Sequence, residues 1–390
     1  MSYETYAGAF HTDIHGTFHP AYQLTGQWAT PGLAGSGTRM ARSGAVTANI
    51  YPGETPALVD MLRASDGFAL TTLSANANEL FEPGPYLQHA MPLTVLYDVP
   101  VHHPIVNEVA GAVRRALVDT RLSAYSESAH QGLARYLQVV VERNSGTAQV
   151  VIVGNSESAE PFAACLDRLR ERLGNALHSL WYNAQASQTN AILGARFTSC
   201  FGPASVIERF GGAAIHYPPG AFGQNNLEIA GRIIDHLRSE VPAGSRVAEL
   251  YAGVGAIGLS LLDGLGHLRI NEASPDSLAG LSMGIAGLPE HLRARVEVMP
   301  GPASGACLAG HASDVIIVDP PRKGLCAEVL QYLREQPPSR LIYVSCGLDA
   351  FLRDAGALLD TGRMRIKGLL AFNLLPFTGH VETVATFERT

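Results

Sequence analysis

The chain lacks the segments that carry a protein into or across a membrane. Among its 390 residues there is no apolar run of the roughly 20 residues that a transmembrane helix needs. The first ten residues, MSYETYAGAF, have neither the cluster of cations nor the apolar stretch of a secretory signal. We therefore expect a cytoplasmic protein without a membrane partner.

Cysteine is scarce, and its spacing fits no disulfide or metal framework. The five cysteines are odd in number and none belongs to a CxxC pair (Cys165, Cys200, Cys307, Cys326 and Cys346). Disulfide scaffolds, zinc fingers and iron–sulfur clusters use paired or regularly spaced cysteines. His11, His15 and His19 have the spacing of metal ligands on a helix, but Gly16 and Pro20 interrupt any helix there. We expect a reduced chain with no metal site and no iron–sulfur cluster.

Charge is also sparse. Asp, Glu, Lys and Arg make up 16% of the residues, and acids outnumber bases to give a net charge of −7. This balance weighs mildly against a nucleic-acid binder, although a local basic groove can lie on an acidic body. Hydrophobic residues, at 46%, suffice for a large core, and the length favours two domains or one large domain with an appendage.

The part of the chain before residue 216 has a mixed pattern. The first sixty residues predict short strands and loops, and three runs predict helices, over residues 56–64, 107–117 and 159–173. Residues 135–154 predict a hairpin that turns at Asn144-Ser145-Gly146, and residues 179–183 predict a strand. We expect an α+β domain with antiparallel strands over residues 1–215.

From residue 216 to residue 390 the hydrophobic pattern of the sequence changes. Short runs rich in Val, Ile and Leu alternate with amphipathic runs, which is typical of a parallel sheet covered by helices on both faces. The last two runs, residues 364–371 and 381–388, have no helix between them and predict a closing antiparallel pair. We expect a doubly wound α/β domain over residues 216–390.

A glycine-rich turn follows the first predicted strand of this second domain. The run ELYAGVGAIG contains Glu249, Tyr251, Gly253 and Gly255, and glycines let the backbone pass close to a ligand. Spacing alone leaves a dinucleotide site, an S-adenosylmethionine (SAM) site and simple tight packing open. Glu272 ends the next predicted strand, where a ribose-binding carboxylate is expected; the alternative is a solvated loop acid.

Three later segments place reactive side chains next to predicted strands. Asp319 ends the apolar run VIIV, and two prolines that stiffen the chain follow it. Cys346 ends the next strand just ahead of a helix, where a thiol can become a nucleophile, although lone cysteines are more often structural. Glu382 lies in a strand of Val and Thr, a costly place for a carboxylate unless it is functional or faces outward at an edge.

These four segments, in this order, resemble the RNA uracil-5-methyltransferase family, the SAM-dependent enzymes that make 5-methyluridine in tRNA and rRNA. Two more segments look like parts of that family: Trp181-Tyr182-Asn183 and Phe222-Gly223-Gln224-Asn225-Asn226. The resemblance covers the chain from about residue 131 to residue 390. It implies a C-terminal class I SAM-dependent methyltransferase domain. The N-terminal domain is a candidate for RNA recognition, although its sequence shows no clear RNA-binding barrel.

The resemblance also implies roles for particular residues. Those expected to bind SAM are Gln224, Tyr251, Gly253, Gly255, Glu272 and Asp319. Cys346 is implied as the nucleophile that adds to C6 of the uridine, and Glu382 as the base that removes the C5 proton. Since a base inside folded RNA is unreachable, the target uridine would be flipped out.

Several residues depart from the family's pattern. Gly347-Leu348 follow Cys346, where the family has Asn-Pro, and residues 299–301 lack the acid or amide expected to hold adenine. The cysteines of the family's N-terminal iron–sulfur site are missing. The expected protein is a monomer that methylates uridine in tRNA or rRNA. The alternatives are C-methylation of a small molecule or free pyrimidine nucleotide, and a non-catalytic RNA-binding relative.

Overall fold

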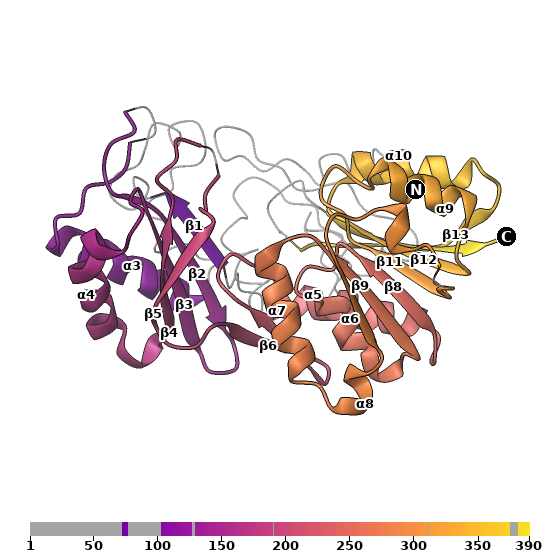
Figure 1. Ribbon diagram of the computed structural model, residues 1–390, viewed down its shortest axis with the longest axis horizontal. Helices are drawn as coiled ribbons and strands as arrows, with labels where there is room; N and C mark the ends of the chain where they lie inside the picture. Colours follow the sequence, from indigo (N-terminus) through magenta and orange to yellow (C-terminus); the bar gives the residue numbers. More distant parts are fainter. Residues whose placement is uncertain (1–71, 77–102, 127–128, 190, 311, 375–380) are drawn as a thin grey trace, which may run out of the picture.

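The computed structural model describes residues 72–76, 103–126, 129–189, 191–310, 312–374 and 381–390. These residues form a five-stranded sheet, a seven-stranded sheet and a two-stranded hairpin (Figure 1). The short strands predicted in the first sixty residues, the helix predicted over residues 56–64 and the three histidines weighed as metal ligands lie outside the described residues. Within the described ranges, no helix is both long and apolar enough to cross a membrane.

The five-stranded sheet has its strands in sequence order. Its elements are β1 (Thr72–Asn76), α3 (Pro104–Asp119), β2 (Ala134–Glu142), β3 (Thr147–Gly154), α4 (Ala163–Leu173), β4 (Leu177–Ala184) and β5 (Arg196–Phe201). The predicted hairpin is confirmed as β2 and β3, with Gly146 at a φ of 66° in the turn. Both helices pack on one face of the sheet, where Leu137, Val139 and Val150 are buried (Figure 1).

One pairing in this sheet differs from the prediction. The sequence pattern predicted antiparallel strands, and β3 and β4 run parallel instead. The difference follows from α4, which crosses between them and returns the chain in the same direction. The remaining neighbours, β1–β2, β2–β3 and β4–β5, are antiparallel as predicted.

The seven-stranded sheet has the order β10-β9-β8-β11-β12-β14-β13. Its strands are β8 (Arg246–Leu250), β9 (His267–Glu272), β10 (Val296–Pro300), β11 (Val315–Val318), β12 (Arg340–Ser345), β13 (Met364–Phe372) and β14 (Glu382–Arg389). Its helices are α5 (Leu227–Glu240), α6 (Ala256–Leu261), α7 (Pro275–Ala286), α8 (Glu290–Arg293), α9 (Ala327–Glu335) and α10 (Leu348–Leu359). β8 to β12 are parallel, and β13 and β14 close the sheet as the predicted antiparallel pair.

Alternate residues of the central strands are buried in two separate hydrophobic cores. Val315 and Ile317 of β11 face the core built with α5, α6 and α7, while Ile316 and Val318 face the core built with α9 and α10. Helices therefore cover both faces, which explains the unbroken apolar strands. The expectation of a doubly wound α/β domain is confirmed.

A hairpin of β6 (Val206–Phe210) and β7 (Ala213–Tyr217) joins the two sheets. Its apolar residues belong to the core around α5 and α7. The turn after β2 holds it through Arg143, whose guanidinium bonds the buried Glu208 at 3.1 Å and the exposed Glu228 at 2.6 Å. The division of the chain into 1–215 and 216–390 stays a prediction, because the boundary falls inside β7.

The contact of Arg143 with Glu208 gives a stability prediction. Arg143→Met leaves the carboxylate of Glu208, which is only 5% exposed, without its cation. We expect the free energy of unfolding to fall by about 2 kcal/mol, measured by urea denaturation. Arg172→Met is the matched control, because its pair with Asp119 is solvent-exposed and worth about 0–1 kcal/mol. Equal losses in the two variants would contradict a structural role for Arg143.

Candidate active site

The register of the parallel strands brings three predicted site residues to one edge. β8 pairs with β9 at Leu250–Asn271 and with β11 at Leu250–Val318. Tyr251, Glu272 and Asp319, each one residue further along, therefore follow the same row of the sheet. This is the carboxyl edge, where sheets of this topology bind their ligands.

Cys346 and Glu382 meet at the same edge from opposite directions. β12 and β14 are antiparallel neighbours with Ser345 opposite Thr383. The next residue outward on β12 is Cys346, and its counterpart on β14 is Glu382. The thiol of Cys346 is half-buried and the carboxyl of Glu382 is 5% exposed. The structure thus brings the predicted nucleophile and the predicted base together.

The charges at this edge perturb one another. Burial raises the pKa of Asp319 to about 7, and burial together with the charge of Asp319 raises the pKa of Glu382 to about 8. Burial, followed by the charges of Glu382 and Asp319, also raises the pKa of the Cys346 thiol, while the Arg322 guanidinium lowers it. Carboxyl groups with a pKa near neutrality are suited to accept a proton, and the thiol needs added positive charge to ionise.

The glycine turn between β8 and α6 is fixed by two carboxylates. Glu249 is 1% exposed, and its Oε2 accepts a hydrogen bond from the Gly258 amide at 2.9 Å. Glu272 accepts one from the Gly253 amide at 2.7 Å, so it is not the solvated loop acid considered as an alternative. Gly253 and Gly255 have φ of 59° and 79°, which favours glycine at both.

Tyr251 links this turn to the loop that follows Asp319. It has a positive φ of 61°, unusual outside glycine, and its hydroxyl accepts a hydrogen bond from the Cys326 amide at 3.2 Å. The same end of the loop is also held by Asp354, which is 0% exposed and accepts a hydrogen bond from the adjacent Leu325 amide at 2.8 Å. Sequence reasoning missed Asp354, although an acid on the apolar side of a predicted helix was a visible signal.

Gln224 comes from a segment outside the strands of the seven-stranded sheet. It belongs to the segment before α5, where the Asn226 side chain accepts a hydrogen bond from the Ile229 amide at 3.2 Å and so caps the helix. The segment lines a cavity of about 380 Å³ that also receives residues of β2, β3 and β7. The lining of that cavity includes neither Cys346 nor Glu382.

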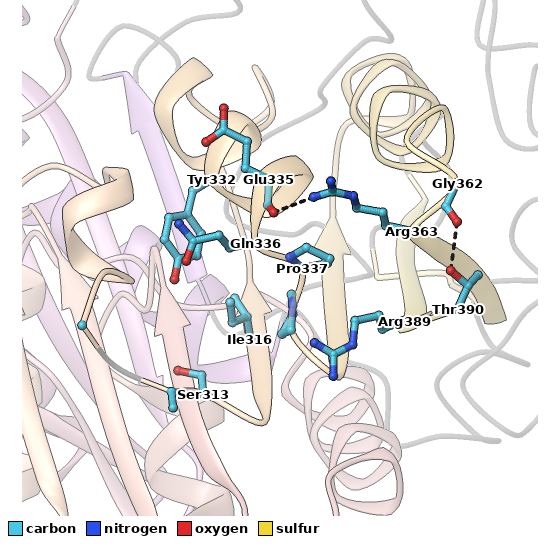
Figure 2. A pocket seen from close by; sticks show the side chains of 13 residues that line it. Ser313, Ile316, Tyr332, Glu335, Gln336, Pro337, Gly362, Arg363, Arg389 and Thr390 are labelled. Carbon is cyan, nitrogen blue, oxygen red and sulfur yellow. Dashed lines mark hydrogen bonds between the residues drawn. The ribbon is translucent and has the colours of Figure 1, made fainter.

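Another cavity, of about 750 Å³, lies at the opposite edge of the seven-stranded sheet (Figure 2). Ser313 lies just before β11 and Thr390 just after β14. The Arg363 guanidinium donates to the Glu335 carbonyl at 2.7 Å and Thr390 donates to the Gly362 carbonyl at 2.9 Å (Figure 2). None of the predicted site residues lines this cavity.

Gly347, which stands where the family has asparagine, is required by the local packing. A Cβ at position 347 would lie 2.8 Å from the carbonyl oxygen of Arg322, closer than real Cβ contacts. The loop after Asp319 therefore packs against the bare backbone that follows Cys346. The asparagine found at this position in the family would push that loop away.

This contact predicts a change in the reactivity of Cys346. Gly347→Ala displaces the backbone of Arg322, and we expect the pKa of the Cys346 thiol to rise as the guanidinium moves away. Alkylation by iodoacetamide, read at Cys346 by mass spectrometry, should slow about two- to fivefold near neutral pH. Gly356→Ala in α10 is the control, because a Cβ there meets nothing within 4 Å. Identical alkylation profiles in both variants would contradict the argument.

Metal binding is not indicated by the described part of the chain. No group of three or more His, Cys, Asp or Glu side chains there could hold a metal ion. All five cysteines are free, including the half-buried Cys346.

Known proteins resemble both the sequence and the fold. The family described as tRNA (uracil-5-)-methyltransferase matches residues 303–390. An uncharacterized RNA methyltransferase of Protochlamydia amoebophila is 32% identical over 295 residues, which cover 74% of this chain and 77% of the relative. One from Halalkalibacterium halodurans is 25% identical over 307 residues, covering 77% of this chain and 65% of the relative.

A solved structure shows the same fold. The tRNA (uracil-54, C5)-methyltransferase of Pyrococcus abyssi, in complex with S-adenosyl-L-homocysteine, superposes with a TM-score of 0.66 at 21% identity. The superposition covers 82% of this chain and 74% of that chain. The identity to the Protochlamydia relative, over three quarters of both chains, confirms the resemblance found in the sequence. This chain belongs to the family of SAM-dependent RNA uracil-5-methyltransferases.

Proposed function

We propose that the enzyme methylates C5 of a uridine in tRNA or rRNA through a transient bond between Cys346 and C6 of the base. The observation that carries the proposal is the placement of Cys346 and Glu382 at the end of two hydrogen-bonded strands. Uracil C5 is too weak a nucleophile to take a methyl group unaided, so a thiol and a base are the minimum set.

The residues at the carboxyl edge fit a bound SAM. A Cβ at Gly253 would meet nothing within 4 Å, so the turn leaves open space for a ligand next to Glu272. Tyr251, Gly253, Gly255, Glu272 and Asp319 would hold SAM from the strand ends, and Gln224 from the segment before α5. When bound, SAM supplies an electrophilic methyl group and a positive charge.

The chain's own residues carry the remaining steps. The Cys346 thiolate adds to C6, and the displaced electron pair makes C5 nucleophilic. After C5 has gained the methyl group, the Glu382 carboxylate removes the C5 proton. The electron pair left behind restores the C5–C6 double bond, and the Cys346 thiolate leaves. Glu382 must be ionised for its step, which its pKa of about 8 allows at mildly basic pH.

Transfer of tritiated methyl from SAM tests the proposal. Unmodified tRNA, unmodified rRNA and free uridine monophosphate are offered separately, and the labelled nucleoside is identified after digestion. We expect 5-methyluridine from one of the two RNAs. If only the free nucleotide is labelled, the acceptor is a small molecule and not RNA. If no acceptor is labelled, the protein is a non-catalytic relative of the family.

A further inference from the structure

The cavity beside Gln224 has features that the proposed reaction does not use. It has a volume of about 380 Å³ and lies between the five-stranded sheet and the segment that leads into α5. One wall is formed by Gln138, Val140 and Gln149, and the facing wall by Tyr217 and residues 221–225. Gln224, which is proposed to contact SAM, also lines this cavity.

Two glutamine side chains line this cavity with oxygens that lack partners. Gln149 is 1% exposed, and its Oε1 is buried without a hydrogen bond. Its Nε2 makes only a long contact of 3.4 Å with the carbonyl of Tyr217. The Oε1 of Gln138 is also buried and without a partner.

The register places the two glutamines on one face. Gln149 stands opposite Val140, and Gln138 stands opposite Val151, so the amides are diagonal neighbours on adjacent strands. That face is the one turned away from α3 and α4. A buried amide oxygen without a partner destabilises the fold, and a ligand that bonds to both oxygens would remove that cost.

The remaining lining selects the chemistry of that ligand. Tyr217, Val140, Val206 and Leu227 offer aromatic and aliphatic surface. The charge of Glu208 is already matched by Arg143, so the described lining offers no free cation for a phosphate. Carboxamides pair in two points with a nucleobase edge that presents a donor beside an acceptor. Proteins read RNA through such edges on unstacked bases.

We infer that this cavity takes one unstacked nucleobase of the RNA substrate, distinct from the target uridine, through the amides of Gln138 and Gln149. The inference rests on the proposed function for the identity of the ligand as RNA. It is distinct from the target position because neither Cys346 nor Glu382 lines the cavity. A neighbouring base held here would fix which uridine reaches the thiol.

The test compares Gln149→Leu and Gln138→Leu with Gln331→Leu. Gln331 is exposed in α9, where it bonds Glu335, and serves as the control. Filter binding with unmodified tRNA and rRNA transcripts should show about tenfold weaker RNA binding for the first two variants only. The affinity for SAM, measured by calorimetry, should not change. The melting temperature should hold or rise, since an unpaired buried amide is replaced by an apolar group.

A second measurement identifies the base. Transcripts with single abasic positions are bound to the parent and to Gln149→Leu. One position other than the target should weaken binding to the parent and have no further effect on the variant. If Gln149→Leu binds RNA like Gln331→Leu, or if no such position exists, the glutamines are simply hydrated and the inference is wrong.

These binding results are independent of turnover. If the glutamine variants lose RNA affinity and the parent methylates no uridine, the proposed reaction fails and the base site stands. If methylation occurs and the variants bind normally, the base site fails alone. An absence of RNA binding by the parent overturns both.

Discussion

Cys346→Ala is expected to lower methyl transfer by about 10⁴-fold or more, because the variant loses the thiol that is proposed to add to C6. The same variant should form no covalent complex with RNA that carries 5-fluorouridine, whereas the parent should be trapped on it. Tritium incorporation and a denaturing gel measure the two effects.

Cys200→Ala is the matched control for the loss of a thiol. Cys200 is also free and half-buried, but it lies in β5 of the other sheet. It should retain full activity and full trapping. Substantial methylation by Cys346→Ala would remove the covalent step from the proposal.

Glu382→Gln is expected to separate methyl transfer from product release. An amide cannot take the C5 proton, so the methylated base should stay bonded to Cys346 and a stable protein–RNA adduct should accumulate. Turnover should fall by about 10²–10⁴-fold, measured in the steady state alongside the adduct on a denaturing gel. In the parent, kcat should rise as the pH passes through about 8, because Glu382 loses its proton there and its step follows methyl transfer.

Glu388→Gln provides the control on the same strand. Glu388 lies at the far end of β14 and pairs with Arg365. Its replacement should cause no adduct and no loss of turnover. A Glu382→Gln variant that releases product at the parent rate would assign the proton to another base.

The alternation of buried strands and helices made the second sheet predictable. Runs such as VIIV at β11 are apolar because helices cover both faces, and this leaves a clear pattern. β5 left none, since its residues are exposed or half-buried, and the hairpin of β6 and β7 was not foreseen either. The apolar residues of this hairpin are buried in a core formed by segments distant in the sequence.

The sequence indicated the residues proposed to react but not the residues that hold the site together. Cys346 and Glu382 were singled out by the resemblance to the family, because position alone left a structural thiol and an outward-facing carboxylate open. The bonds of Asp354 to the Leu325 amide and of Glu249 to the Gly258 amide depend on tertiary contacts. Gln138 and Gln149 gave no signal, since their burial depends on how the two sheets meet.

The position of Cys346 and Glu382 on paired strands affects how the enzyme should lose activity on heating. Adjacent strands of a sheet lie about 4.8 Å apart, and the ladder between β12 and β14 fixes that spacing close to both side chains. Amides of Val344 and Val384 should then exchange with deuterium only when the whole domain opens. Heat inactivation should accordingly coincide with global melting, with no earlier loss from a loosened active centre.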